Sequence, residues 1–268
     1  MQKVNTLTAE ERLQWQRDGY IVREEVLAPD EVERLSAASE ELCKQLADAS
    51  SEERKVDVSA FYVFELDMLQ DVLIKWEPGS RTVIQGVEPV AHLHPVIAEF
   101  GAHPGLTEPS AELLELEAVE LYTEKLNVKR AGVGGAFALH RDLPYWVGSS
   151  DDPERMLTVL LTLDDATVEN GALQVLPGSH HIDDLPFKDS EREFERNEID
   201  PDRMDTSGMV TVEIPAGSAI FFGPRLVHTS GANHSAFDRR AMLYTYQAPG
   251  QRDMRQVNRE WYHSENPT

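Results

Sequence analysis

Residues 218–231 read Ser218-Ala-Ile-Phe-Phe-Gly-Pro-Arg-Leu-Val-His-Thr-Ser-Gly231. The stretch holds two short runs of strand-forming residues, 218–222 and 226–229, with a Gly-Pro pair between them. Similar runs, punctuated by Gly, Pro, Asn and Asp, occupy 119–128, 156–163, 171–176, 209–214 and 241–247. Short strands in this arrangement are typical of an all-β sandwich or barrel. We therefore predict a mainly β fold with flanking helices and a double-sheet core, for which a jelly roll is one way to protect the strand edges.

The first part of the chain carries helical signals instead. Thr8 and Glu11 have the spacing of a capping box, and Pro29 opens a second helical pattern that runs to about residue 47. Residues 50–60 are polar and loop-like, whereas residues 183–208 combine many charges with few apolar groups. We predict one domain over 1–268, with a helical part over about 1–117, a jelly-roll core over about 118–250 and an exposed insertion over about 183–208.

Composition excludes several classes of protein. The chain has 268 residues and a formal net charge of −23, which would repel a phosphate backbone, so we expect no nucleic-acid partner. No run of about 18 apolar residues is present, and the polar start lacks the apolar stretch of a signal peptide, so we expect no membrane partner. The single cysteine, Cys43, cannot form an internal disulfide. Together these features predict a cytoplasmic protein, and they leave the oligomeric state open.

The residues with the clearest chemistry are His140 and Asp142. In an extended chain, residues two apart project from the same face, so an imidazole and a carboxylate can bind one metal ion together while Arg141 points away. His228, in another predicted strand, can supply a third ligand. Two histidines and one carboxylate form the facial triad of non-haem iron(II) oxygenases. Taken alone, a His-x-Asp triplet also fits an ordinary surface turn.

Arg239 follows His228 by eleven residues, at the start of a predicted strand. A guanidinium grips a carboxylate through two parallel hydrogen bonds, so Arg239 can anchor the far end of a dicarboxylate that chelates the metal. Ser230 lies on the same strand face as His228 and can donate its hydroxyl to that carboxylate. Arg240 is the rival anchor, but strand alternation lets only one of the two arginines face a pocket, and the spacing favours Arg239.

The motif 137–142, the segment 169–180 (Glu-Asn-Gly-Ala-Leu-Gln-Val-Leu-Pro-Gly-Ser-His) and the stretch from His228 to Arg239 resemble the phytanoyl-CoA dioxygenase family. The resemblance runs in order from about residue 10 to about residue 250. It implies a double-stranded β-helix (a cupin-like jelly roll) and an enzyme that uses Fe(II), the co-substrate 2-oxoglutarate and O2. Nothing in the chain resembles a coenzyme A site, so the family name does not indicate the substrate.

The resemblance also implies roles for individual residues. It makes His140, Asp142 and His228 the iron ligands, and it places the far carboxylate of 2-oxoglutarate on Arg239 and Ser230. It puts further 2-oxoglutarate contacts at Asn127 and Lys125, which alternate onto one strand face; a solvated face is the other interpretation. Trp146 resembles an aromatic residue that borders the substrate pocket in the ectoine hydroxylase branch. Tyr145 can serve instead, and a core position fits either ring.

The expected activity is oxidative decarboxylation of 2-oxoglutarate coupled to C–H oxidation of a small molecule, most simply hydroxylation in the tailoring of a natural product. Asp142 disfavours halogenation, because related halogenases have a small residue at this position. Ring closure, epimerisation and desaturation are alternatives with the same cofactor chemistry. A non-catalytic jelly roll that binds a metal or ligand, and a metal-dependent hydrolase or isomerase, are alternatives that need no carboxylate anchor beside the metal.

Overall fold

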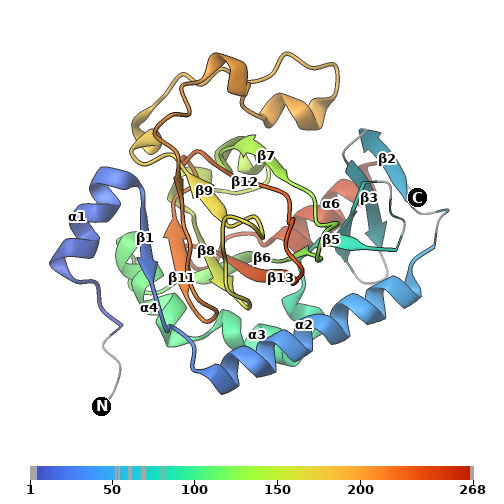
Figure 1. Cartoon of the computed structure of the whole chain (residues 1–268), viewed down its shortest axis with the longest axis horizontal. Coiled ribbons are helices and arrows are strands. Elements are labelled where there is room, and N and C mark those ends of the chain that lie inside the picture. Colours follow the sequence, from blue (N-terminus) through green and yellow to red (C-terminus); the bar gives the residue numbers. More distant parts are fainter. Residues whose placement is uncertain are drawn as a thin grey trace.

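Two antiparallel sheets face each other in the computed structural model, which describes residues 5–265 except 52, 54, 60–61, 68–70, 79 and 81 (Figure 1). The larger sheet has the order β1 (Tyr20–Arg23), β11 (Ala219–Phe222), β8 (Leu157–Thr162), β13 (Arg239–Gln247), β6 (Glu120–Lys129), β5 (Ile84–Glu88), β4 (Val72–Trp76), β3 (Tyr62–Asp67) and β2 (Val56–Ser59). The smaller sheet has the order β10 (Val210–Thr211), β9 (Leu173–Val175), β12 (His228–Ser230) and β7 (Phe137–His140). The mainly β, jelly-roll fold class is confirmed.

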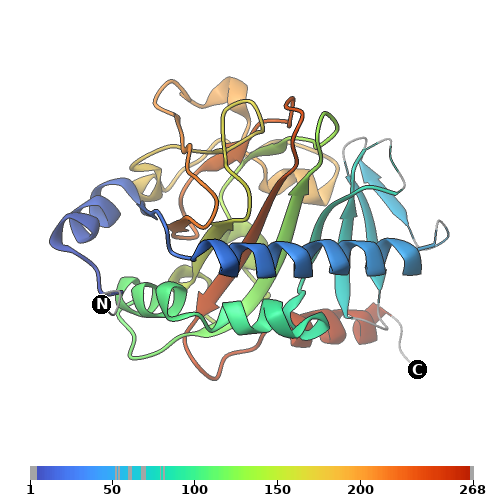
Figure 2. The ribbon, with the colours of Figure 1, turned by 60° about the horizontal axis from the view of Figure 1, so that its bottom comes forward.

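Helices cover one side of the larger sheet. Figure 2 shows α2 (Pro29–Ala49) crossing the strands, with α3 (Pro95–Gly101) and α4 (Pro104–Leu113) beside it. The predicted capping box is present at α1 (Ala9–Asp18), where Thr8 accepts the Glu11 N–H and the Glu11 side chain accepts the Thr8 N–H. The remaining elements are α5 (Leu143–Trp146), α6 (Met254–Glu265) and the 3-10 turns η2 (Ala91–Leu93), η3 (Pro153–Arg155), η4 (Ser179–His181), η5 (Glu193–Asn197) and η6 (Pro201–Arg203). In the described part of the chain, no helix combines the length and the apolar character needed to span a membrane.

Alternation along the central strands gives the larger sheet two different faces. On β6 and β13, the residues Leu126, Val128, Met242 and Tyr244 are buried in the same apolar core as Leu42 of α2. The residues between them on these strands point to the opposite face, toward the smaller sheet. That inner face carries the polar side chains from which the site described below is built.

The structure corrects two predictions about the flanking segments. The helical part was wrong where the described residues form β2, β3, β4 and β5, which extend the larger sheet, and β2 lies within the loop predicted over 50–60. The insertion over 183–208 projects beyond the smaller sheet (Figure 1), and about half of its described side chains are exposed. Glu198 and Ile199 are nevertheless buried, because Ile199 donates its N–H to the Leu139 carbonyl of β7 at 2.7 Å.

Two glycines with positive φ lie in loops that differ in how tightly they are packed. Gly171 has φ +78° and a Cβ there would overlap the Gly231 carbonyl, whereas Gly132 has φ +68° and open space around it. We expect Gly171→Ala to lower the free energy of unfolding by roughly 3 kcal/mol, since it adds a backbone clash to conformational strain. Gly132→Ala adds only the strain, about 1 kcal/mol. Urea denaturation measures both, and equal losses would contradict this packing.

Candidate metal centre

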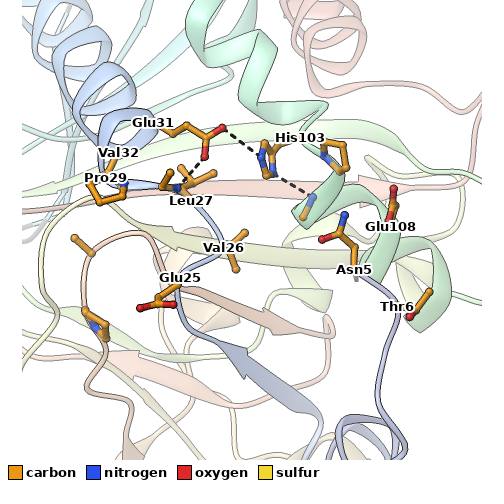
Figure 3. A pocket seen from close by; sticks show the side chains of 15 residues that line it. Asn5, Thr6, Glu25, Val26, Leu27, Pro29, Glu31, Val32, His103 and Glu108 are labelled. Atoms are coloured by element: carbon orange, nitrogen blue, oxygen red, sulfur yellow. Dashed lines mark hydrogen bonds and ion pairs between the residues drawn. The ribbon is translucent and has the colours of Figure 1, made fainter. Parts of the chain in front are cut away.

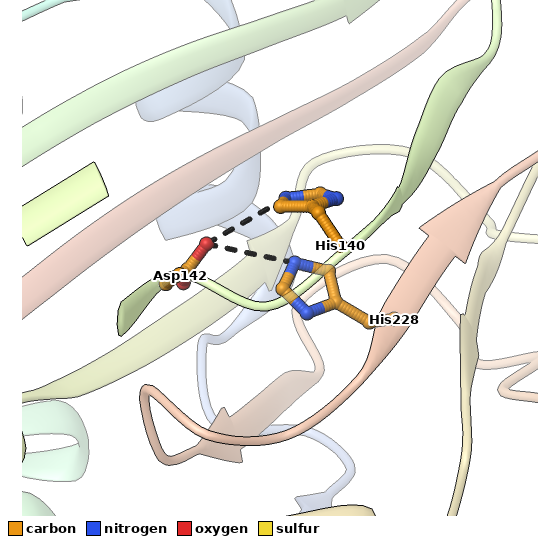
Figure 4. Close-up of side chains that lie close together, drawn as sticks. All are labelled: His140, Asp142 and His228. Atoms are coloured by element: carbon orange, nitrogen blue, oxygen red, sulfur yellow. Dashed lines mark ion pairs between the residues drawn. The ribbon is translucent and has the colours of Figure 1, made fainter. Parts of the chain in front are cut away.

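Strand pairing brings His140 and His228 side by side. They are register partners in β7 and β12, and their ring centroids lie 4.2 Å apart. Asp142 follows β7 by two residues, and its Oδ1 lies 3.6 Å from His140 Nε2 and 3.7 Å from His228 Nε2 (Figure 4). The three ligand atoms all lie within 4.8 Å of one another, so one ion can contact all three. Within the described ranges, no other group of His, Cys, Asp and Glu has this geometry.

Backbone carbonyls set the tautomers of both histidines. His140 Nδ1 lies 2.7 Å from the Ala138 carbonyl, and His228 Nδ1 lies 3.0 Å from the Leu226 carbonyl. Each Nδ1 therefore carries the proton and donates it, which leaves the Nε2 lone pair directed at the shared space. Burial, and then the neighbouring His228, lower the pKa of His140 well below its usual value, so the ring stays in the neutral, ligating form. This donor set fits a divalent iron ion with three further coordination positions open.

A cavity of about 310 Å³ opens beside the triad, between the two sheets. All nine residues singled out from the sequence line it: Lys125, Asn127, His140, Asp142, Tyr145, Trp146, His228, Ser230 and Arg239. They come from both sheets and from α5. The fold therefore gathers into one space the groups that the sequence places far apart.

Arg239 closes the end of the cavity away from Asp142. Its side chain is buried, with 2% of the residue exposed, and Nη2 donates to the Gly171 carbonyl at 2.9 Å. Nε has no hydrogen-bond partner, and no ion pair to Arg239 occurs among the described residues. Burial lowers the pKa of Arg239 to about 10, yet the group stays charged at neutral pH. A buried guanidinium without a carboxylate is a site prepared for an anion.

Arg240 points the other way. Its guanidinium donates to Asp164 at 2.7 Å and lies 3.3 Å from Glu40. The two arginines thus occupy opposite faces of β13, as the alternation predicted, and Arg239 is the one that lines the cavity. Asn127 is the register partner of Ala241, and its Oδ1 is buried without a hydrogen-bond partner.

The two aromatic residues of α5 form part of the cavity wall. Tyr145 meets the His140 ring edge-on at 5.8 Å, and the Trp146 ring meets Tyr122 edge-on at 6.2 Å. Trp146 also packs with Met156, so it serves the core and lines the cavity at once.

Sequence reasoning missed several charged residues of the cavity: Lys75, Glu88 and Glu198. Glu88 is the last residue of β5, and its Oε1 lies 3.3 Å from Lys125 Nζ. Lys75 sits over the Phe137 ring at 4.3 Å. Glu198 comes from the insertion and forms a β-bridge with His140. Of these three residues, only Lys75 lies in a pattern that the sequence displays, the apolar run 72–76.

A second, larger cavity of about 1170 Å³ lies between the start of α2 and α4. Its polar wall includes Glu31 and His103, whose side chains are 3.7 Å apart (Figure 3). None of the residues predicted for the site lines it. The residues predicted for the site therefore line the smaller cavity and not this one.

Comparison with known proteins identifies the family. The family model described as phytanoyl-CoA dioxygenase (PhyH) matches residues 15–241. The chain belongs to the phytanoyl-CoA dioxygenase family. As a member, it is an iron(II)- and 2-oxoglutarate-dependent oxygenase that consumes O2.

Three relatives of this family member show the range of the likeness. L-proline trans-4-hydroxylase from Streptomyces griseoviridis is 33% identical over 157 residues, which span 51% of this chain and 57% of the relative. Ectoine dioxygenase from Bordetella parapertussis is 26% identical over 255 residues, 90% of this chain and 76% of the relative. The crystal structure of EctD from S. alaskensis with bound Fe superposes with a TM-score of 0.67 at 25% identity, covering 92% of this chain and 79% of that one.

Replacing each of the adjacent arginines separates anchoring from stability. We expect Arg239→Ala to weaken 2-oxoglutarate binding by about 30-fold or more, because the far carboxylate loses a buried charge partner. Arg240→Ala removes only the contacts to Asp164 and Glu40, so the affinity stays within about twofold and unfolding becomes easier by about 1 kcal/mol. Titration of the anaerobic Fe(II) protein measures the affinities. If Arg240→Ala had the larger effect on affinity, the anchor assignment would be wrong.

Proposed function

We propose that this enzyme hydroxylates an aliphatic carbon of a small molecule, as a tailoring step in the synthesis of a natural product. The observation that carries the proposal is the pairing of a His-Asp-His triad with the buried, anion-seeking Arg239 across one cavity. A metal-binding or ligand-binding jelly roll without catalysis, and a metal-dependent hydrolase or isomerase, have no use for such an anchor. The names of the relatives, a proline hydroxylase and ectoine dioxygenases, favour hydroxylation.

In this proposal His140, Asp142 and His228 hold the iron, and Arg239 and Ser230 take the far carboxylate of 2-oxoglutarate. When bound, iron with 2-oxoglutarate supplies the oxidising chemistry: O2 is reduced, 2-oxoglutarate becomes succinate and CO2, and one oxygen atom enters the substrate C–H bond. Asn127 and Lys125, which line the same cavity, would contact the co-substrate. Thr158, whose Oγ1 lies 3.5 Å from Asp142 Oδ2, supports the carboxylate that ligates.

Tyr145 and Trp146 border the substrate in this proposal, because α5 follows Asp142 directly and both rings line the cavity. Their apolar faces would exclude water from the reacting carbon and orient the substrate. Ring closure, epimerisation and desaturation use the same site and differ in where the substrate radical lies. The outcome therefore depends on the substrate's own shape.

We also propose that the protein acts in the cytoplasm on a diffusible small molecule. Its only cysteine, Cys43, is a buried thiol whose pKa burial raises to about 11, which suits a reducing compartment.

The proposal is tested with purified protein, Fe(II) and 2-oxoglutarate. We expect a weak visible charge-transfer band without oxygen, followed by succinate release when air is admitted. His140→Ala removes one imidazole ligand, so it should abolish iron binding and with it the band. Thr167→Ala, which changes a loop outside the cavity, serves as the control and should retain the band. A well-folded wild-type protein that forms no band and no succinate would support the non-catalytic alternative.

A further inference from the structure

Lys129 is a buried lysine directly behind the co-substrate anchor. It ends β6, two residues after Asn127, and its register partner in β13 is Arg239. The residue is 0% exposed, and it does not line the cavity itself. Two cationic side chains therefore stand side by side at the end of the sheet where the far carboxylate of 2-oxoglutarate is expected.

Three backbone carbonyls surround the Lys129 amine. Nζ donates to the carbonyls of Gly135 at 3.0 Å, Ser230 at 3.5 Å and Gly231. An ammonium group has three N–H donors and no acceptor, whereas a neutral amine would turn a lone pair toward one of these oxygens. The geometry thus suits the protonated lysine.

These contacts fix the segment that carries Ser230. Asn233 donates its N–H to the Gly134 carbonyl at 2.8 Å and its Nδ2 to the Lys129 carbonyl at 2.8 Å. A Cβ at Gly134 would overlap the Lys129 backbone, so the turn after β6 packs directly on this residue. Lys129 therefore joins the turn after β6 to the turn after β12, and Ser230 is held from both sides.

The charges that face Lys129 do not balance. Arg239 approaches it from β13, and Glu77, which follows β4, accepts the Gly135 N–H at 2.9 Å. The turns 131–135 and 230–233 contain no titratable side chain, and β7 presents the Phe137 ring, 5.2 Å from Nζ. Lys75 of β4 also acts on Lys129 electrostatically, and its Nζ lies 4.3 Å from the same Phe137 ring. Basic side chains thus outnumber carboxylates around Lys129, which leaves positive charge for a ligand to neutralise.

We propose that Lys129 is a positioning residue of the 2-oxoglutarate anchor, which fastens Ser230 and adds a second positive charge behind Arg239, so that co-substrate binding is linked to protonation of Lys129. The proposal rests on the function proposed above, since it requires 2-oxoglutarate to bind beside Arg239.

The linkage has a definite sign. Burial, and then the charge of Arg239, lower the pKa of Lys129 to about 7 in the free protein. A dianion bound nearby favours the charged lysine and raises that pKa. Binding therefore takes up protons above about pH 7, and affinity is highest on the acid side and falls as the pH rises.

Calorimetry of the full chain with Fe(II), without oxygen, measures this directly. Titration with 2-oxoglutarate in two buffers of different ionisation enthalpy counts the protons taken up. We expect uptake at about pH 8 and an affinity that falls about tenfold between about pH 6 and about pH 8.5. Lys129→Met should bind about tenfold more weakly at about pH 6, with no dependence on pH in this range. Lys129→Gln, which keeps a neutral donor, should likewise lose the pH dependence.

Asn233→Ala is the matched control, because it loosens the same turn and removes no charge. It should weaken binding at every pH and keep the slope of the wild-type protein. The proposal is overturned if wild-type binding takes up no proton, if Lys129→Met keeps the slope, or if Asn233→Ala loses it. The proton count requires only wild-type protein, so it decides the matter even where a variant does not fold.

The charge-transfer band separates the two proposals. Absence of the band in the wild-type protein at every pH contradicts the proposed function. A normal band together with pH-independent 2-oxoglutarate affinity contradicts only the role of Lys129.

Discussion

The pairing of β7 with β12 is the interaction on which the rest of the site depends. It sets His140 directly opposite His228, and the two carbonyls that bind the Nδ1 atoms come from the same two segments. The backbone therefore brings the two imidazoles together and also turns their Nε2 atoms inward. Asp142 needs only to leave the strand two residues later to complete the triad. A shift of one strand by one residue would place the two imidazoles on opposite faces of the smaller sheet.

The larger sheet performs two tasks through alternation alone. One face of β6 and β13 carries Leu126, Val128, Met242 and Tyr244, which pack beneath α2. The other face carries Lys125, Asn127 and Arg239, which line the cavity, and Lys129 behind them. Burial of the apolar face holds the polar face in place, so the cationic groups are oriented before any ligand arrives. Such preorganisation lowers the cost of binding a dicarboxylate.

Much of this was predictable from local signals. The strands from β6 to β13 follow from short runs between turn residues, and the arginine that faces the cavity follows from strand parity. The strand β4 was missed because the run at 72–76 is largely buried on both faces and lacks the alternation that marks a half-exposed strand. Glu198 was missed because only a bridge to His140 across 58 positions of the chain brings it into the cavity. Lys129 was not singled out from the sequence, because its surroundings depend on backbone carbonyls from two distant turns.

A crystal structure of the anaerobic complex with Fe(II) and 2-oxoglutarate tests the central claim most directly. The account predicts a metal about 2.0–2.2 Å from Nε2 of His140, Nε2 of His228 and a carboxylate oxygen of Asp142. It also predicts the far carboxylate of 2-oxoglutarate in contact with the Arg239 guanidinium and the Ser230 hydroxyl. Metal density away from this triad, or a dicarboxylate bound without Arg239, would contradict it.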